Sequence, residues 1–206
     1  MSPATRTAAL LLLCPGITGS VLAADFCASP EQARQVAEFY AANPGTMPPV
    51  AATRLALPEA TVASALGADA SASAPAADFA EIWAAIGAWK EATFLIMKGA
   101  NVFEIRSAAG KGTPSKSSKY FNIEYSHPLR GHLRPDLYSA IYAVKLPGKN
   151  KDQVAPRGVL FYDQDGASVF GAFLGGDGPP PDPADLARFD ELMKLMRSKA
   201  PACPKA

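Results

Sequence analysis

The hydrophobic periodicity of the chain changes from helical to strand-like near residue 92, and this change most constrains the fold. Up to that point five large apolar residues recur at helical spacing: Phe79, Ile82, Trp83, Ile86 and Trp89. The pattern predicts a helix over residues 79–89 capped by Asp78, and two tryptophans at this spacing are more typical of a core than of a cofactor site. Residues 93–98 and 102–106 then alternate like the two strands of a hairpin.

The remaining periodic segments extend this to an order of helices, strands and a final helix. Further strands are expected over residues 138–146, 158–162 and 168–174, and further helices over residues 30–42, 50–57, 57–66 and 185–197. Strands that follow one another closely pair antiparallel. We therefore predict an α+β fold with a large antiparallel β-sheet, an N-terminal helical cap and a C-terminal helix.

Composition divides the chain into five expected parts. Residues 1–24 are a signal peptide, 25–66 an N-terminal helical segment, 67–77 a linker, 78–198 the α+β domain and 199–206 a flexible tail. The linker is inferred from the low complexity of GADASASAPAA. Residues 108–118 contain Gly-Lys-Gly-Thr without the glycine spacing of a phosphate loop, so we expect a mobile loop there.

The N-terminal segment has the layout of a secretory signal, with Arg6 before a short apolar run and small residues near Ala24. The run is too short to span a bilayer, so the protein is not expected to be an integral membrane protein. This predicts a periplasmic or secreted protein; a misplaced start codon would instead leave it cytoplasmic. After export, Cys27 and Cys203 could pair and join the two ends, or remain free thiols in flexible tails.

Charge and motifs exclude several function classes. The formal net charge of +1 gives no general attraction to nucleic acid. Three short helices over residues 30–66 resemble a helix-turn-helix. The second and third of these helices have a single cation, Arg54, so no DNA-reading face is expected. The chain has neither Gly-x-Ser-x-Gly nor His-Glu-x-x-His, and therefore shows little sign of hydrolytic chemistry.

Residues 119–134, KYFNIEYSHPLRGHLR, hold both histidines of the chain, His127 and His132. Alternation over residues 120–125 predicts a strand, followed by a turn at Pro128 and Gly131. Aromatic and basic side chains surround the imidazoles. The segment therefore predicts an aromatic surface ringed by cations, which suits a flat, apolar, doubly anionic ligand. His127, next to proline, is expected to be a solvated loop residue.

Over residues 33–196 the chain resembles the heme-utilisation carrier proteins of the HutX/ChuX type. The matching stretches are Asn43-Pro44-Gly45-Thr46, Trp83 with Trp89, Tyr120-Phe121-Asn122, Gly131-His132-Leu133-Arg134, and Asp165-Gly166 leading to Val169-Phe170 and Phe173-Leu174-Gly175. The resemblance implies a homodimer of antiparallel sheets, similar to half of the HemS-type heme proteins. It also implies heme in a cleft on each subunit, and exchange with heme donor or acceptor proteins during iron acquisition.

The resemblance places the two family histidines at His132 and Met97, which implies that His132 binds the heme iron. Met97 is then either an axial thioether, which would raise the reduction potential of the iron, or an apolar residue of the pocket. Arg134 and Lys119 are the implied partners of the heme propionates. Tyr120 is either a core aromatic or a hydrogen-bond partner of heme. The side chains expected to bury the porphyrin are Phe103, Tyr120, Phe121, Ile141, Phe161 and Phe173.

Three functions compete at this point. The first is a heme-binding carrier for heme transport or storage, without catalysis. The second is a heme-degrading enzyme, which a single histidine ligand would favour and two axial ligands would disfavour. The third is a dimeric binding module that has lost heme, motivated by Met97 and by Gly176, which stands where the family has a cation.

Overall fold

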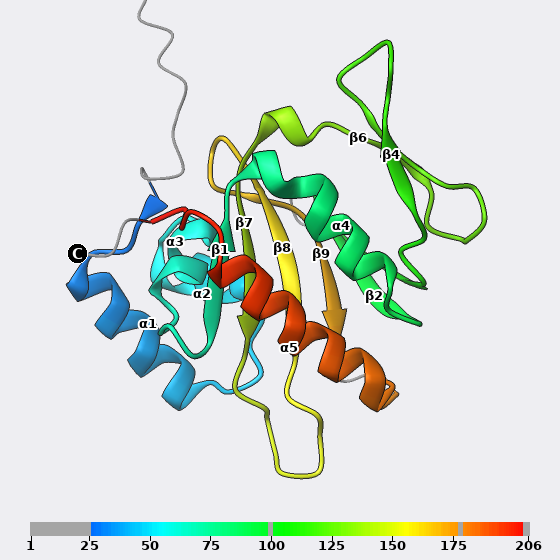
Figure 1. Cartoon of the computed structure of the whole chain (residues 1–206). Helices are drawn as coiled ribbons and strands as arrows, with labels where there is room; N and C mark the ends of the chain where they lie inside the picture. The colour runs from blue at the N-terminus through cyan, green and yellow to red at the C-terminus, as the bar shows by residue number, and fades with distance from the viewer. Residues whose placement is uncertain (1–25, 99–100, 177–178, 204–206) are drawn as a thin grey trace, which may run out of the picture.

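The structure is a computed structural model that describes residues 26–98, 101–176 and 179–203 (Figure 1). The predicted signal peptide, residues 1–24, lies outside these residues, as do Asp177 and the end of the chain after residue 203. None of the helices in the described ranges has the length and hydropathy needed to cross a bilayer.

Three short helices form the N-terminal part: α1 (Pro30–Ala42), α2 (Pro48–Leu55) and α3 (Glu59–Ala65). The predicted start of α1 is confirmed, since the Ser29 hydroxyl accepts a hydrogen bond from the backbone N–H of Gln32, and the Gln32 side chain accepts one from Ser29 N–H. Helix α2 is followed by its C-cap residue Ala56, a non-glycine residue in the left-handed conformation with φ of 53°. The helices therefore begin and end close to the predicted positions.

A six-stranded antiparallel sheet forms the centre of the molecule, in the order β1-β7-β8-β9-β2-β3. Its strands are β1 (Ser71–Ala74), β2 (Ala92–Lys98), β3 (Asn101–Ser107), β7 (Tyr138–Lys145), β8 (Arg157–Asp163) and β9 (Ser168–Leu174). A separate three-stranded sheet contains β4 (Gly112–Pro114), β5 (Phe121–Ile123) and β6 (Gly131–Leu133). The predicted hairpin of β2 and β3 and the three later strands are thus confirmed.

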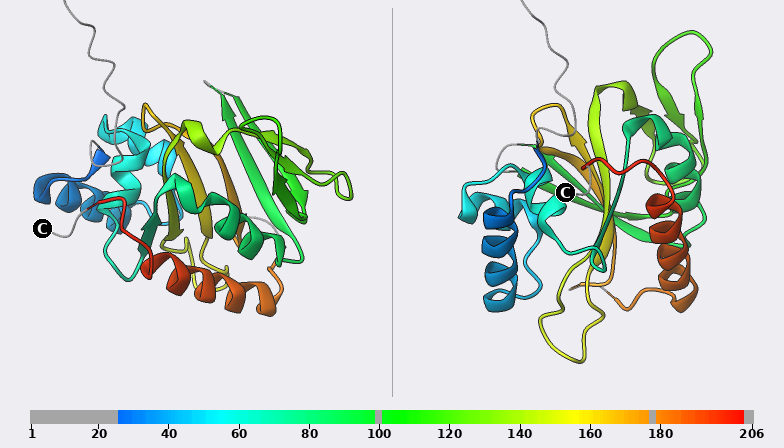
Figure 2. Two further views of the ribbon diagram at one scale, coloured as in Figure 1. Left: turned by 45° about the horizontal axis from the view of Figure 1, so that its top comes forward. Right: turned by 60° about the vertical axis from the view of Figure 1, so that its left-hand side comes forward.

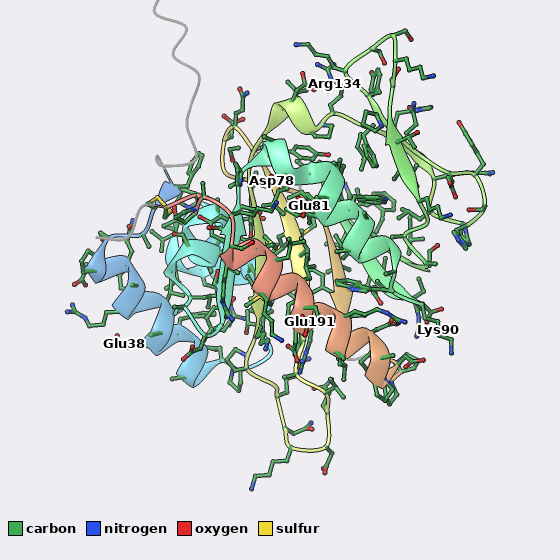
Figure 3. The ribbon with its side chains drawn as sticks, viewed as in Figure 1. Glu38, Asp78, Glu81, Lys90, Arg134 and Glu191 are labelled. Atoms are coloured by element: carbon green, nitrogen blue, oxygen red, sulfur yellow. A yellow bond between two sulfur atoms is a disulfide. The ribbon has the colours of Figure 1, made fainter. Side chains whose placement is uncertain are left out.

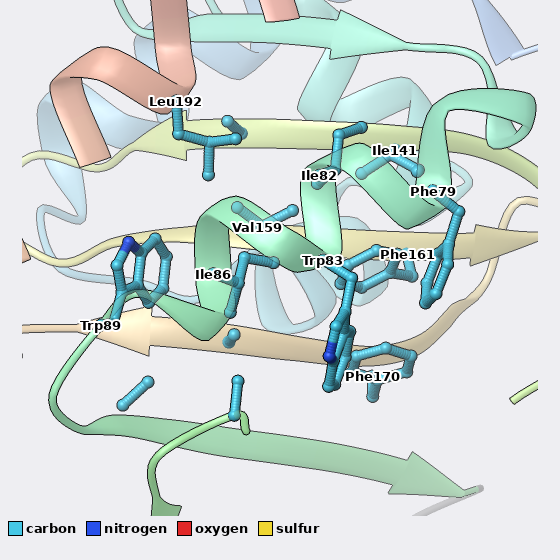
Figure 4. Packing of buried hydrophobic residues seen from close by; sticks show 14 of the residues in the cluster. Phe79, Ile82, Trp83, Ile86, Trp89, Ile141, Val159, Phe161, Phe170 and Leu192 are labelled. Carbon is cyan, nitrogen blue, oxygen red and sulfur yellow. The ribbon is translucent and has the colours of Figure 1, made fainter. Parts of the chain in front are cut away.

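Helices cover both faces of the large sheet (Figure 2). Helices α4 (Phe79–Gly87) and α5 (Pro183–Arg197) pack on one face, and α1 to α3 pack on the other. Strand β7 contributes to both cores, since Ile141 and Ala143 point toward α4 and α5, whereas Tyr142 and Val144 point the other way. Figure 4 shows the apolar side chains of α4 packed against β7, β8 and β9. The N-terminal helices are therefore part of one packed α+β unit.

The prediction of a linker over residues 67–77 is wrong, because these residues contain β1, the edge strand that pairs with β7. The Ser-Ala alternation places Ala72 and Ala74 on the buried side of the strand, 6% and 0% exposed. Ser71 donates a hydrogen bond to the carbonyl of Ala63 at 3.0 Å. Side chains this small give a weak hydrophobic signal, yet they let the neighbouring helix α5 pack closely.

The C-terminal residues 199–203 are fixed rather than flexible, contrary to the prediction. Cys203 forms a disulfide with Cys27, which resolves the question of their pairing. Lys199 forms ion pairs with Asp78 and Glu81, both labelled in Figure 3. Asp78 thus pairs with Lys199 at the start of α4, and its side chain makes no capping hydrogen bond, contrary to prediction.

Candidate functional site

The small sheet rests on α4 through its inner face. Phe121 of β5 is 3% exposed, and its ring centroid lies 5.0 Å from that of Phe79 and 6.0 Å from that of Trp83. The indole N–H of Trp83 donates to the carbonyl of Gly110 at 3.2 Å, just before β4. Residues 108–118 therefore hold a strand and a fixed anchor, where a mobile loop was predicted. The short strand β6 occupies the segment expected to be only a turn.

The outer face of the small sheet carries the predicted site residues. The register pairs Asn122 of β5 with His132 of β6, and Thr113 of β4 with Asn122. Cross-strand partners lie on the same face of a sheet, and alternate residues of β5 and β6 belong to the inner core. Thr113, Asn122 and His132 therefore form a row on the face turned away from α4.

The imidazole of His132 is exposed and has a defined tautomer. Its Nδ1 lies 2.7 Å from the carboxamide oxygen of Asn122. Because this oxygen can only accept a hydrogen bond, Nδ1 carries the proton in the neutral ring and Nε2 keeps its lone pair. A side chain that fixes one ring nitrogen and leaves the other available is the arrangement of a metal-binding histidine.

Tyr120 lies between His132 and Arg134. Its ring meets the imidazole edge-on with centroids 5.9 Å apart, and the guanidinium of Arg134 lies over its face at 5.5 Å. The ring is 43% exposed. Tyr120 is therefore a surface aromatic of the site, not a core residue.

Arg134 and Lys119 share an acidic partner that the sequence analysis missed. Nε and Nη2 of Arg134 donate to the two carboxylate oxygens of Asp136 at 2.8 and 2.9 Å, and Nζ of Lys119 lies 3.6 Å from the same carboxylate. The hydrogen bonds from Arg134 lower the pKa of Asp136 to about 2. Asp136 belongs to the short 3₁₀ helix η3 (Pro135–Leu137), where an acid after a proline indicates only a turn. Figure 3 shows Arg134 at the end of the molecule that carries the small sheet.

A groove of about 480 Å³ runs beside Tyr120 and Lys119. Its other wall comes from the 3₁₀ helix η2 (Ala76–Asp78) and the first turn of α4, with the small side chains of Ala76, Ala77 and Ala80. Phe121 and Tyr138 line its base. The groove offers an apolar surface next to the cations of the site. Phe121 lines this groove although it is only 3% exposed, since most of its ring is buried in the core.

Met97 and His132 lie on opposite sides of the core that contains α4. Along β2, Phe94 and Ile96 pack into that core, so the half-buried Met97 points to the other face of the large sheet. His132 leaves the same core in the opposite direction, on the outer face of the small sheet. The structure therefore does not bring these two residues to one iron within a single chain.

The expected porphyrin-burying cluster is also not brought together. Ile141 and Phe161 are 0% exposed in the core under α4, and Phe173 belongs to the core under α1 to α3. Phe103 is 58% exposed on the edge strand β3. Ile141, Phe161 and Phe173 serve the fold, because a chain with helices on both faces of its sheet needs two cores. His127 is exposed, in agreement with its expected place in a solvated loop.

Within residues 26–98, 101–176 and 179–203, no group of three or more His, Cys, Asp or Glu side chains is arranged to hold a metal ion directly. A metal at His132 would have to arrive with other ligands of its own.

Comparison with protein families matches residues 72–192 to the family described as haem utilisation ChuX/HutX. The chain belongs to this family. The match covers α4, the small sheet and the large sheet from the second residue of β1 onward. No curated protein matches the sequence.

Solved structures share the fold. A protein from Agrobacterium tumefaciens is 24% identical over 81% of this chain and 92% of its own, with a TM-score of 0.67. The heme-binding protein ChuX is 19% identical over 79% of this chain and 99% of its own, with a TM-score of 0.66. Holo-PhuS, a heme-binding protein from Pseudomonas aeruginosa, is 20% identical over 85% of this chain and 49% of its own, with a TM-score of 0.65. The α+β fold predicted from the sequence is thereby confirmed.

Proposed function

We propose that the chain binds heme on the outer face of the small sheet, with Nε2 of His132 as an axial ligand of the iron. The observation that carries the proposal is the hydrogen bond between Nδ1 of His132 and Asn122, which leaves Nε2 as an exposed lone-pair donor. Membership of the haem-utilisation family supports heme as the ligand. When bound, heme would supply an iron with axial positions open to protein ligands.

The neighbouring side chains fit the rest of such a ligand. The exposed ring of Tyr120, edge-on to the imidazole of His132, offers apolar contact to a porphyrin. Arg134 and Lys119 offer cations to its propionates, and an arginine can hold a carboxylate through two parallel hydrogen bonds. Asn122 holds the imidazole in the tautomer that binds a metal. Phe121 supports this surface from below and contributes little direct contact.

We propose that the protein is a carrier in heme transport or storage rather than an enzyme. The site lies open at the surface, which favours direct transfer of heme from a donor protein or to an acceptor protein. Heme degradation is the second candidate, and one observation favours it: Met97 lies on the other face of the sheet, so the second axial position of a heme bound by His132 has no ligand from Met97 of the same chain. Incubation of the complex with ascorbate and oxygen separates the two. A stable Soret band indicates a carrier, and its loss with release of a bile pigment indicates an enzyme.

Titration with hemin tests the proposal. Saturation near one heme per chain is expected for the wild type and for His127→Ala, the matched control in the second histidine. His132→Ala should weaken binding and shift the Soret band while its far-ultraviolet circular dichroism stays native. Equal spectra and affinities for the two variants would contradict the assignment, and absence of saturable binding in all three proteins would favour a module that has lost heme.

Export and dimerisation are part of the same proposal. A disulfide forms and persists in oxidising compartments, so the Cys27–Cys203 bond supports a periplasmic or secreted protein. Its mature N-terminus should map near Ala24 or Asp25. A homodimer is supported by β3, an edge strand with Val102 and Phe103 each 58% exposed. Phe103→Lys should lower the molar mass measured by light scattering to that of one chain if this edge is the interface.

A further inference from the structure

The two cations of the candidate site are already engaged by one internal carboxylate. Asp136 accepts both hydrogen bonds of the Arg134 fork and lies 3.6 Å from Lys119. The side chains of Arg134 and Asp136 remain 34% and 30% exposed, so solvent and ligands can reach the pair. A carboxylate approaching Arg134 from outside would need the same two donors that Asp136 now uses.

The way Asp136 is held distinguishes it from a structural carboxylate of the same chain. Asp185 is 1% exposed and accepts hydrogen bonds from the backbone N–H groups of Lys90 and Glu91 as well as from Arg188. In the described part of the chain, the carboxylate of Asp136 is held by the side chains of Arg134 and Lys119 and by no backbone N–H group. Both partners are long, flexible and partly exposed, so they can turn to another anion without disturbing the backbone.

We propose that Asp136 is an exchangeable internal counter-ion: it occupies the anion site of Arg134 and Lys119 until a carboxylate of the ligand displaces it, and it thereby speeds ligand release. This inference rests on the proposed function, since it concerns how heme propionates are received at the same site. On binding, one carboxylate replaces another and the number of charge-assisted hydrogen bonds on Arg134 stays the same. On release, Asp136 returns to Arg134 and takes over those hydrogen bonds.

Two consequences follow when a ligand carboxylate replaces the carboxylate of Asp136. The cations contribute less to affinity than free cations would, which suits a protein that hands its ligand on. A ligand without free carboxylates cannot displace Asp136, so its release should be independent of this residue. Asp136 would then affect the affinity and release of anionic tetrapyrroles and leave those of neutral ones unchanged.

The test compares Asp136→Asn with Asp190→Asn in the otherwise unchanged chain. Asp190 on α5 pairs with Lys145 at 2.7 Å, so its substitution changes the net charge equally at an acid of another cluster and controls for general electrostatic attraction. The probes are hemin and hemin dimethyl ester, and the readout is the rate of heme transfer to excess apomyoglobin. Asp136→Asn should release hemin about twofold to fivefold more slowly than Asp190→Asn and the wild type, the range expected for an exposed ion pair. The ester should leave all three proteins at equal rates.

A second pair of variants protects the test against indirect effects. In the background of Arg134→Gln, the Asp136→Asn substitution should slow release much less, since the hydrogen-bonded cation for which the two carboxylates compete is absent and only Lys119, 3.6 Å from Asp136, remains. Equal hemin release from Asp136→Asn and Asp190→Asn, or faster release from Asp136→Asn, would overturn the exchange while leaving His132-dependent binding intact. Absence of saturable hemin binding by the wild type would remove the proposed function itself, and the inference with it.

Discussion

Removal of the Cys27–Cys203 disulfide is expected to lower the free energy of unfolding by about 5 kcal/mol. The bond joins residues 176 positions apart, so it closes almost the whole described chain into one loop. In the chain-entropy model, a cross-link of this length removes conformational freedom from the unfolded state equivalent to about 5 kcal/mol near room temperature. Since domains are typically stable by about 5–15 kcal/mol, the loss would be a large part of the total.

Urea unfolding of the oxidised and reduced protein, followed by tryptophan fluorescence, measures this difference. Cys27→Ser, Cys203→Ser and the double variant should share one midpoint, because loss of either thiol removes the same bond. The reduced wild type provides the matched control and should unfold at the midpoint of these variants. In the three disulfide variants, the free energy of unfolding should also fall more steeply with urea concentration, since their unfolded chain exposes more surface.

Two results would refute the reasoning. Coincident midpoints for the oxidised and reduced wild type would mean that the bond does not form or does not restrict the unfolded chain. A loss in Cys203→Ser without an equal loss in Cys27→Ser would mean that the effect comes from local packing of one thiol, for instance against the Tyr142 hydroxyl, 3.3 Å from Cys203 Sγ.

Four further predictions follow from the fold and the site. Phe121→Ala should cost about 3–5 kcal/mol in urea unfolding because the ring is core, and a loss below about 1 kcal/mol would contradict that assignment. Ala74→Leu should cost about 1–3 kcal/mol by overpacking β1, whereas a true linker would tolerate it. Burial raises the pKa of Tyr142 from 10.0 to about 12. The stability that the neutral Tyr142 hydroxyl gives the folded state should therefore be complete below pH 10 and lost as the pH rises through 12. A Tyr142→Phe variant with the same alkaline unfolding curve as the wild type would disprove this. Asn122→Leu should weaken hemin binding by about 10-fold to 100-fold, the usual cost of losing the partner of a metal-binding histidine, whereas Thr113→Val in the same row should not.

Periodicity was sufficient for most elements of the fold. The spacing of large apolar residues on α4 and the Ser29 cap of α1 are local signals, and the structure agrees with both closely. Strand β1 could not be found this way, because Ala72 and Ala74 are small and become buried only through pairing with β7, some 70 residues later in the chain. Strand β6 was not predicted because three residues that begin with a glycine carry too little pattern.

The site was only partly predictable for a related reason. Residues 119–134 drew attention through their histidines and cations, and the structure gathers Tyr120, His132 and Arg134 on one surface. Asp136 was missed because its role depends on the hydrogen bonds from the side chain of Arg134, which the sequence does not show. Met97 was paired with His132 through family resemblance alone. The two residues lie on different sheets, and the packing of α4 between these sheets decides which face each residue occupies.

The central claim is that Nε2 of His132 binds the heme iron. Electron nuclear double resonance of the ferric complex tests it most directly, using protein labelled with ¹⁵N in histidine, of which the chain has only two. We predict a strong hyperfine coupling to histidine ¹⁵N in the wild type and in His127→Ala, and its loss in His132→Ala. A coupling that survives in His132→Ala, or a wild-type complex without any histidine coupling, would contradict the account.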